Sequence, residues 1–219
     1  MTCKNCEPWF RRSPGSFVKV TAADWTCCAE CGQYLIREKV DDSKWDTYFH
    51  SICVTVSTKS PCLSRKIGAV IVKDHSIVST GYNGPPRGIP HCGQDRFLSD
   101  TTVSKQFDDI LLLPNIRRRI DFECPRRVLG YESGTHMELC PAQHAEENAI
   151  SNAARLGVSV LGSTLYMNSV IPCSKCFGTL INAGITEVVI EEVKAYDKHT
   201  QYLIDNSSIV IRSFENKTN

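Results

Sequence analysis

Hydrophobic and polar positions follow two different periods along this chain. After Asp41, apolar side chains recur at helical spacing, which predicts a buried amphipathic helix that Ser43 and Asp46 would cap. The residues in question are Trp45, Tyr48, Phe49, Ile52, Cys53 and Val56. Two β-rich runs follow, "IGAVIVKD" and "SIVSTGYN", and the Asp74-His75 pair between them predicts a hairpin turn.

The C-terminal part of the chain alternates regularly between the two periods. We expect a helix from about Pro141 to Leu156, a strand at "STLYMN" and a helix that starts near Pro172. A strand at "EVVIEE", a helix from Asp197 to Asp205 and a last strand at "SIVIRSF" complete the series. Strands that alternate with helices predict a layered α/β domain with a largely buried sheet.

Two segments do not show this regular alternation of helical and strand patterns. Residues 1–40 are short of aliphatic side chains and carry "CKNC" and "CCAEC". Residues 84–141 are polar, and only "ILLLP" within them is strongly apolar, so we interpret them as an insertion. The sequence thus predicts an N-terminal segment, 1–40, and a domain over 41–219 that contains the insertion.

The composition narrows the class of protein. The chain has 219 residues, 42% of them hydrophobic, and a formal net charge of +1, which does not indicate a strongly charged partner such as duplex nucleic acid. Neither a membrane-spanning run nor a signal peptide is evident, which predicts a cytoplasmic protein. A reducing compartment rarely keeps disulfides, so most of the twelve cysteines are expected to hold metal.

One cysteine pair belongs to a motif with defined chemistry. His144-Ala145-Glu146 is followed, after 25 residues, by Pro172-Cys173-Ser174-Lys175-Cys176. One imidazole and two thiolates give zinc three protein ligands and leave the fourth tetrahedral position for water. The helix start after Pro172 favours thiolates over thiols. The order H-x-E…P-C-x-x-C is the signature of zinc-dependent nucleobase deaminases.

Spacing alone does not identify the carboxylate that moves protons. On a regular helix residue 147 lies nearer His144 than residue 146 does, because positions i and i+3 share a face. The family pattern selects Glu146, and we take the assignment from there. The alternative for the whole motif is a closed structural zinc site with a carboxylate that happens to lie nearby.

Further stretches extend the match beyond the zinc motif. They are "SRKIGAVIV", "STGYNGPPRG", "CPRRVLGYESG", "HAEENAI", "PCSKC" and "INAGITEVVI". In this order they resemble the deoxycytidylate (dCMP) deaminase family over residues 43–213. The resemblance implies a cytidine-deaminase-like three-layer α/β/α fold with a mixed five-stranded sheet, and hydrolysis of dCMP to dUMP and ammonia.

The resemblance also implies roles for individual residues. His144, Cys173 and Cys176 would hold the catalytic zinc, and Glu146 would shuttle protons. Asn83 and Ala145 would contact the substrate, Asn83 at the sugar, where an amide both donates and accepts. The alternative for "GYNGPPRG" is a plain turn. The run "MNSVI" has one residue more than the family usually has, which leaves open whether a 5-substituted cytosine is accepted.

Arg155 follows His144 by eleven residues and matches a family position that reaches the nucleotide phosphate of a neighbouring subunit. A guanidinium suits phosphate because its forked donors bind two oxygens. A solvated surface arginine is the alternative. By the same resemblance the protein would be a homo-oligomer, commonly a hexamer, with dCTP as activator and dTTP as inhibitor.

A second zinc is predicted between the insertion and the catalytic helix. Its ligands would be four cysteines, with His136 or His91 able to replace one of them: Cys62, Cys92, Cys124 and Cys140. Scattered buried thiols are the alternative. On this interpretation the stretch "ELCPAQHAEENAI" serves two sites.

The N-terminal segment predicts a zinc ribbon. Cys3-x2-Cys6 and Cys28-x2-Cys31 are paired knuckles separated by 21 residues, and a segment with so little apolar mass needs metal to fold. Cys27 is a spare or an alternate ligand, and Cys53 is expected in the core.

Three functions compete at this point. The first is an enzyme that acts on free dCMP. The second is an editor of polynucleotide, in which the ribbon and "WFRR" contact nucleic acid by stacking and charge. The third is a non-catalytic assembly subunit. The near-neutral charge and the long insertion favour the first, and the intact Glu146 argues against the third.

Overall fold

The computed structural model describes residues 43–107, 114–132, 134–195 and 197–214, together with two short strands, β1 (Trp25–Cys27) and β2 (Tyr34–Ile36). The chain divides into two compact units, Met1–Asp42 and Ser43–Asn219. In the first unit β1 and β2 pair antiparallel. The predicted ribbon ligands lie outside the described residues: Cys3, Cys6, Cys28 and Cys31.

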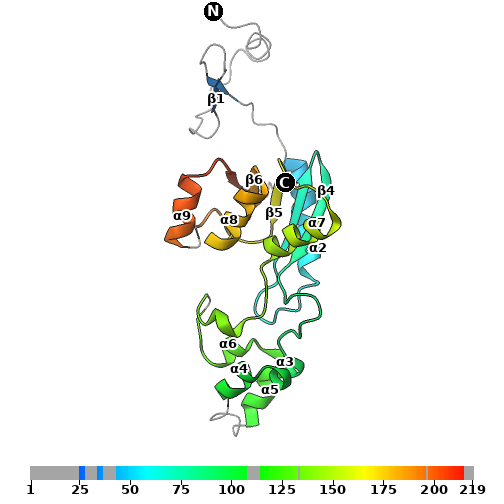
Figure 1. Cartoon of the computed structure of the whole chain (residues 1–219), viewed down its shortest axis with the longest axis vertical. Coiled ribbons are helices and arrows are strands. Elements are labelled where there is room, and N and C mark those ends of the chain that lie inside the picture. Colours follow the sequence, from blue (N-terminus) through cyan, green and yellow to red (C-terminus); the bar gives the residue numbers. More distant parts are fainter. Residues whose placement is uncertain are drawn as a thin grey trace, which may run out of the picture. The chain divides into compact units, whose positions relative to one another are not determined.

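The second unit is built on a mixed five-stranded sheet of order β4-β3-β5-β6-β7 (Figure 1). Strand β3 pairs antiparallel with β4 and β5, whereas β5, β6 and β7 run parallel. The sheet that the resemblance implied is therefore confirmed. The strands span Gly68–Lys73 (β3), Ser76–Tyr82 (β4), Thr164–Met167 (β5), Glu187–Ile190 (β6) and Val210–Ser213 (β7).

Helices cover both faces of this sheet, as the predicted three-layer architecture requires. On one face, Phe49 and Cys53 of α2 pack against β3, β5 and β6. On the other, α7 and α8 bury alanine, phenylalanine and leucine side chains in the larger core cluster, with α9 packed against it. The helices span Ser43–Ser57 (α2), Ala145–Leu156 (α7), Ser174–Ala183 (α8) and Lys198–Asp205 (α9). Of the helices described, none is both long and apolar enough to traverse a lipid bilayer.

The predicted hairpin is confirmed at the turn between β3 and β4. Asp74 and His75 adopt positive φ angles of 49° and 57°, which is the left-handed pair that a two-residue type I′ turn needs. Aspartate tolerates this region because its short polar side chain bonds locally.

Two glycines let a helix lie directly on each face of the hairpin. A Cβ atom at Gly68 would come within 2.1 Å of the Cys53 carbonyl oxygen in α2, and one at Gly81 within 2.3 Å of the Ala149 amide nitrogen in α7. Backbone atoms cannot move aside as a flexible side chain can. The distance of α7 from the sheet is therefore set by the missing side chain at Gly81.

We expect Gly81→Ala to destabilise the domain by about 3 kcal/mol or more, because the methyl group meets helix backbone. Gly178→Ala is the matched control, since a Cβ there meets nothing within 4 Å and alanine favours the α8 helix by roughly 0.5–1 kcal/mol. Urea denaturation curves of the two variants and the parent measure both changes. Equal midpoints for Gly81→Ala and the parent would contradict the close approach.

A buried ionic network ties α2 to the far strands of the sheet. Asp46 is 5% exposed and accepts a hydrogen bond from the Tyr166 hydroxyl (3.0 Å) as well as a forked pair from Arg212. Arg212 also donates to Glu187 (2.7 Å). Burial beside these carboxylates raises the pKa of Tyr166 above its usual value. Asp46, predicted to pair with Ser43 as a cap, is thus engaged in tertiary bonds.

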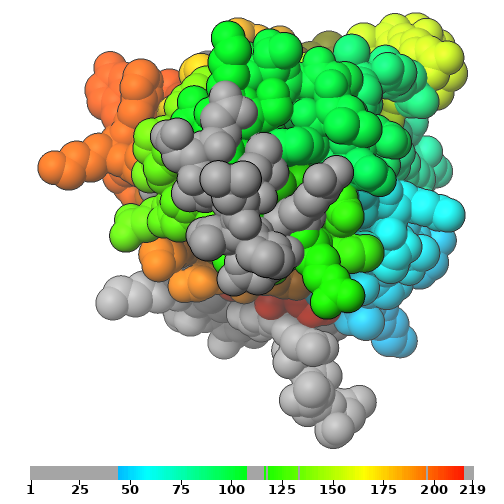
Figure 2. All heavy atoms as spheres, turned by 90° about the horizontal axis from the view of Figure 1, so that it is seen from below, coloured from blue at the N-terminus to red at the C-terminus, as the bar shows by residue number. Residues whose placement is uncertain are grey.

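The insertion has a hydrophobic core of its own, which the sequence did not predict. Six of its residues are buried together: Val103, Phe107, Ile116, Ile120, Val128 and Leu139. They come from short helices that lie grouped together in Figure 1 and make up much of the face shown in green in Figure 2. These helices are α3 (Gln94–Ser99), α4 (Thr101–Ser104), η2 (Lys105–Phe107), α5 (Pro114–Phe122), α6 (Pro125–Val128) and η3 (Met137–Leu139).

Candidate active site

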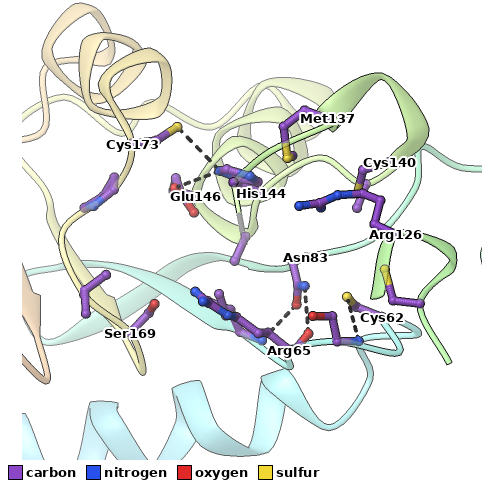
Figure 3. Close-up of a pocket in the computed structure, with 18 of the residues that line it drawn as sticks. Cys62, Arg65, Asn83, Arg126, Met137, Cys140, His144, Glu146, Ser169 and Cys173 are labelled. Atoms are coloured by element: carbon purple, nitrogen blue, oxygen red, sulfur yellow. Dashed lines mark hydrogen bonds and ion pairs between the residues drawn. The ribbon is translucent and has the colours of Figure 1, made fainter. Parts of the chain in front are cut away.

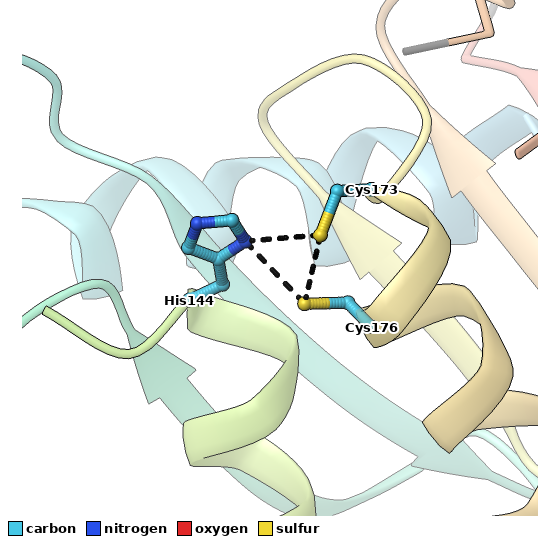
Figure 4. Close-up of side chains that lie close together, drawn as sticks. All are labelled: His144, Cys173 and Cys176. Atoms are coloured by element: carbon cyan, nitrogen blue, oxygen red, sulfur yellow. Dashed lines mark hydrogen bonds between the residues drawn. The ribbon is translucent and has the colours of Figure 1, made fainter. Parts of the chain in front are cut away.

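Two helix N-termini meet at one point and bring the zinc motif together (Figure 4). His144 is the N-cap residue of α7 and Cys173 that of α8, and Cys176 lies in the first turn of α8. The His144 Nδ1 atom lies 3.6 Å from Cys173 Sγ and 3.3 Å from Cys176 Sγ, and the two sulfur atoms are 3.5 Å apart. Three side chains from two elements therefore point at a common centre.

The triangle of donor atoms fits a tetrahedral zinc ion. Bond lengths of about 2.3 Å to sulfur and about 2.1 Å to nitrogen place such ligand atoms roughly 3.5–3.8 Å from one another. Within the part of the chain that the structure describes, no other group of three or more histidine, cysteine or acidic side chains has its ligand atoms within 4.8 Å of one another. Three protein ligands leave one coordination position for water or substrate.

The three ligands also shift one another's pKa values. The contact between the Cys173 and Cys176 sulfur atoms lowers the pKa of Cys173 to about 4. The same contact, together with burial, raises the pKa of Cys176. Cys173 and Glu146 raise the pKa of His144 to about 11. A divalent ion would displace the protons held between these groups, because it binds the thiolate and neutral imidazole forms.

The structure shows which of the two adjacent glutamates faces the metal ligands, a question that the residue spacing left open. The Glu147 carboxylate accepts a hydrogen bond from the backbone amide of His144 (3.1 Å) and so caps the start of α7. The Glu146 side chain is 4% exposed and has a carboxylate oxygen 3.7 Å from His144 Nδ1. Of the pair, Glu146 lines the cavity beside the metal ligands. Glu146 is therefore the acid within reach of a reacting group there.

A cavity opens in front of this cluster and contains the other predicted substrate contacts (Figure 3). Asn83 and Ala145 line it together with His144, Glu146 and Cys173. The Asn83 side chain is held on both sides, since its Oδ1 accepts from the Ile67 amide (2.8 Å) and its Nδ2 donates to the Arg65 carbonyl (2.9 Å). Its amide is thus fixed in orientation, and among the described residues the second Nδ2 hydrogen has no acceptor.

Arg155 does not reach this cavity in its own chain. It is exposed on α7 and borders a separate depression with Arg87 and Asn152. The Arg87 guanidinium donates to the Asn152 side chain there (2.8 Å). A role at a neighbouring subunit stays a prediction for this residue.

The four cysteines of the predicted second zinc are brought near one another only in part. Cys62, Cys124 and Cys140 line the same cavity as His144. Cys92 is not in that lining, but burial and the nearby Cys124 and Cys140 thiols raise its pKa, while Arg96, 3.5 Å from its sulfur atom, opposes that shift. Among the described residues these thiols do not form a group within ligand distance. The substitute ligands are engaged elsewhere: His136 stacks on Tyr131 and bonds Glu138, and His91 bonds its neighbour's carbonyl.

Part of the cavity wall was not predicted. The insertion contributes Arg126, Arg127, Tyr131 and Met137, and the loop before α8 contributes Ser169, Val170 and Ile171. The signal for the first group was the basic pair after Cys124-Pro125 in "CPRR", but its pattern alone indicated no role. The loop is the one that carries the extra residue in "MNSVI".

Comparison with known proteins places these features in context. Residues 43–192 match the family model of the cytidine and deoxycytidylate deaminase zinc-binding region. The deoxycytidylate deaminase of Saccharomyces cerevisiae is 30% identical over 170 residues, which cover 78% of this chain and 45% of the yeast protein. The chain therefore spans less than half the length of that relative.

A phage relative and a solved structure extend the comparison. The deoxycytidylate deaminase of Mycobacterium phage D29 is 32% identical over 152 residues, which cover 66% of this chain and 92% of the phage protein. The crystal structure of dCMP deaminase from cyanophage S-TIM5, in complex with dCMP and dUMP, aligns with a TM-score of 0.52 at 20% identity and covers 80% of this chain and 99% of that one. At that identity the structural likeness concerns the fold.

Proposed function

This chain belongs to the family of cytidine and deoxycytidylate deaminases, and from that premise we propose that it hydrolyses dCMP to dUMP and ammonia. One observation carries the proposal: a histidine, two cysteines and a buried glutamate converge at one end of a cavity whose wall also holds Asn83. In such a reaction water adds its oxygen at C4 of the cytosine ring and the exocyclic amine leaves as ammonia.

His144, Cys173 and Cys176 would hold the zinc ion. When bound there, zinc supplies Lewis-acid activation of a water molecule at neutral pH. The protein's own contribution is to present three donors from two helix starts, so that the site is already assembled. The family's zinc-binding region and the His/Cys/Cys cluster support zinc as the cofactor.

Glu146 would move the protons of the reaction. Its carboxylate takes one proton from the attacking water and passes it to the ring nitrogen, and then takes the second proton of the same water and supplies it to the departing amine. Burial of the side chain keeps the carboxylate in a fixed place beside the metal ligands. The Asn83 amide, held by two backbone bonds, would donate its remaining hydrogen to a sugar hydroxyl, and the wall at Ala145 would contact the ring.

An ammonia-release assay with several substrates tests this proposal. We expect release to be fastest from dCMP and slower by at least an order of magnitude from deoxycytidine, CMP and dCTP, with none from single-stranded DNA. A 5-substituted dCMP shows whether the longer "MNSVI" loop admits a substituent. Faster release from DNA than from dCMP would favour the polynucleotide editor, whose "WFRR" element lies outside the described residues.

The remaining assignments are proposals from the same family resemblance. They comprise the second zinc at Cys62, Cys92, Cys124 and Cys140, the ribbon zinc, the homo-oligomer with Arg155 at a neighbouring subunit, and regulation by dCTP and dTTP. The shared cavity wall of Cys62, Cys124 and Cys140 supports the second zinc. The exposed position of Arg155 beside Arg87 is compatible with a contact to another subunit.

A further inference from the structure

Arg126 is one of two arginines of the insertion that line the cavity of the candidate active site, and it is the less exposed of the two, the other being Arg127. Arg126 belongs to the short helix α6, which directly follows Cys124, and its side chain lines the cavity together with Asn83, His144 and Glu146. Figure 3 shows the guanidinium directed from the insertion toward His144. A residue from a separate helix of the insertion thus faces the same space as the metal ligands.

The donors of this guanidinium are largely unused within the described part of the chain. Nη2 donates to the Glu132 carbonyl oxygen at 3.3 Å, which is a long bond, and the buried Nε has no acceptor there. No ion pair of Arg126 is found among the described residues, whereas Arg96, Arg119 and Arg212 each pair with a carboxylate. Glu138, which senses the charge of Arg126, has its carboxylate bonded to His136.

An uncompensated guanidinium on a cavity wall calls for an anionic ligand. Leaving a buried donor without a partner is costly, and charge-assisted bonds to phosphate relieve that cost, since the forked donors match two phosphate oxygens. An arginine with a purely structural role would be expected to donate most of its hydrogen bonds to carbonyl oxygens of its own loop. Arg126 makes one such bond, and that a weak one.

We propose that Arg126 binds the 5′-phosphate of the nucleotide whose base faces His144, and that the insertion thereby selects a nucleoside monophosphate over the nucleoside. The inference rests on the proposed function and deepens it. Arg126 is a specificity-determining residue on this view: it does not take part in proton transfer, and its contribution is absent when the substrate lacks the phosphate.

The test compares Arg126→Gln with the parent full-length, zinc-loaded protein on dCMP and on deoxycytidine. The ratio of kcat/KM for dCMP to kcat/KM for deoxycytidine should fall by a factor on the order of 10 to 100, with the deoxycytidine value within about threefold of the parent. Arg126→Lys should recover part of the ratio, because a point charge attracts phosphate without the fork. Arg118→Gln, an exposed arginine of α5 outside the cavity lining, should leave the ratio unchanged.

A second measurement does not depend on turnover. Calorimetric titration with dUMP and deoxyuridine should show that the parent prefers dUMP and that Arg126→Gln loses this preference. An equal fall in kcat/KM for both substrates, or an unchanged preference for dUMP in Arg126→Gln, would overturn the proposal. Absence of ammonia release from dCMP by the parent would instead refute the proposed function, and the titration would still decide the role of Arg126.

Discussion

The Glu146→Gln variant is expected to retain its zinc and to lose dCMP deamination by about 1,000-fold or more. Glutamine is nearly isosteric with glutamate, so the side chain can occupy the same buried position beside His144. It cannot accept the water's proton or return protons to the ring and the leaving amine. Ammonia release at saturating dCMP, with zinc content measured by mass spectrometry on the same sample, checks both halves of the expectation.

Glu147→Gln is the matched control for this variant. Its side-chain oxygen can still accept from the His144 amide, so the cap at the start of α7 survives and activity should stay within about threefold of the parent. A Glu146→Gln protein that deaminates at a tenth of the normal rate would refute the assignment. The reverse order of the two effects would transfer the role to Glu147.

Cys176→Ser should remove one zinc ion per chain and abolish activity. Without the ion the pKa of the attacking water returns from about 7 toward about 15.7, so we expect a loss beyond about 1,000-fold. The two thiolates and one imidazole provide all the protein ligands of the cluster, and a serine hydroxyl replaces a thiolate poorly. Zinc content and ammonia release, measured for this variant and for the Cys31→Ser and Cys53→Ala variants, test this result.

Substitutions at two other cysteines distinguish the catalytic zinc site from the predicted ribbon zinc and from a buried thiol that binds no metal. Cys31→Ser in the predicted ribbon should also lower the zinc content by one but leave the rate on dCMP unchanged. Cys53→Ala should change neither, because burial in the α2 core raises the pKa of this thiol to about 12 and no described metal-ligand group includes it. Full zinc content in Cys176→Ser with activity above a tenth of the parent would show that the ion binds elsewhere.

The layered sheet was predictable because strands and helices that bury one face carry strong periodicity. The runs around β3 and β4 and the alternation after Leu156 gave each element to within a few residues. The start of α7 was placed near Pro141, four residues early, since the sequence pattern does not show where backbone leaves the helical region. His144 has an extended conformation, with ψ at 162°, and is the N-cap residue.

This boundary explains why spacing did not choose between the two glutamates. The rule that positions i and i+3 share a face holds only for residues inside a helix. Because His144 lies outside the first turn, Glu147 turns back to the N-cap amide and Glu146 faces the ligands instead. If the sequence had shown that His144 is the N-cap residue of α7, it would also have indicated that Glu146, and not Glu147, faces the metal ligands.

The cavity wall was the part that the sequence did not reveal. The helices of the insertion are three to nine residues long, too short for a clear 3.6-residue period, and their core forms from residues scattered between Val103 and Leu139. The direction of Arg126 depends on that packing. Cysteine spacing alone likewise did not determine how closely Cys62, Cys92, Cys124 and Cys140 approach one another.

The separate core of the insertion bears on how substrate recognition can vary among proteins with this fold. Because the insertion buries its own apolar residues, its sequence can change without repacking the sheet or the helices that hold the metal ligands. Grafting the segment between β4 and α7 from a relative with a different substrate should therefore transplant recognition while the chemistry stays in place. On this expectation the helices with the metal ligands would stay unchanged while the insertion determines which substrate binds.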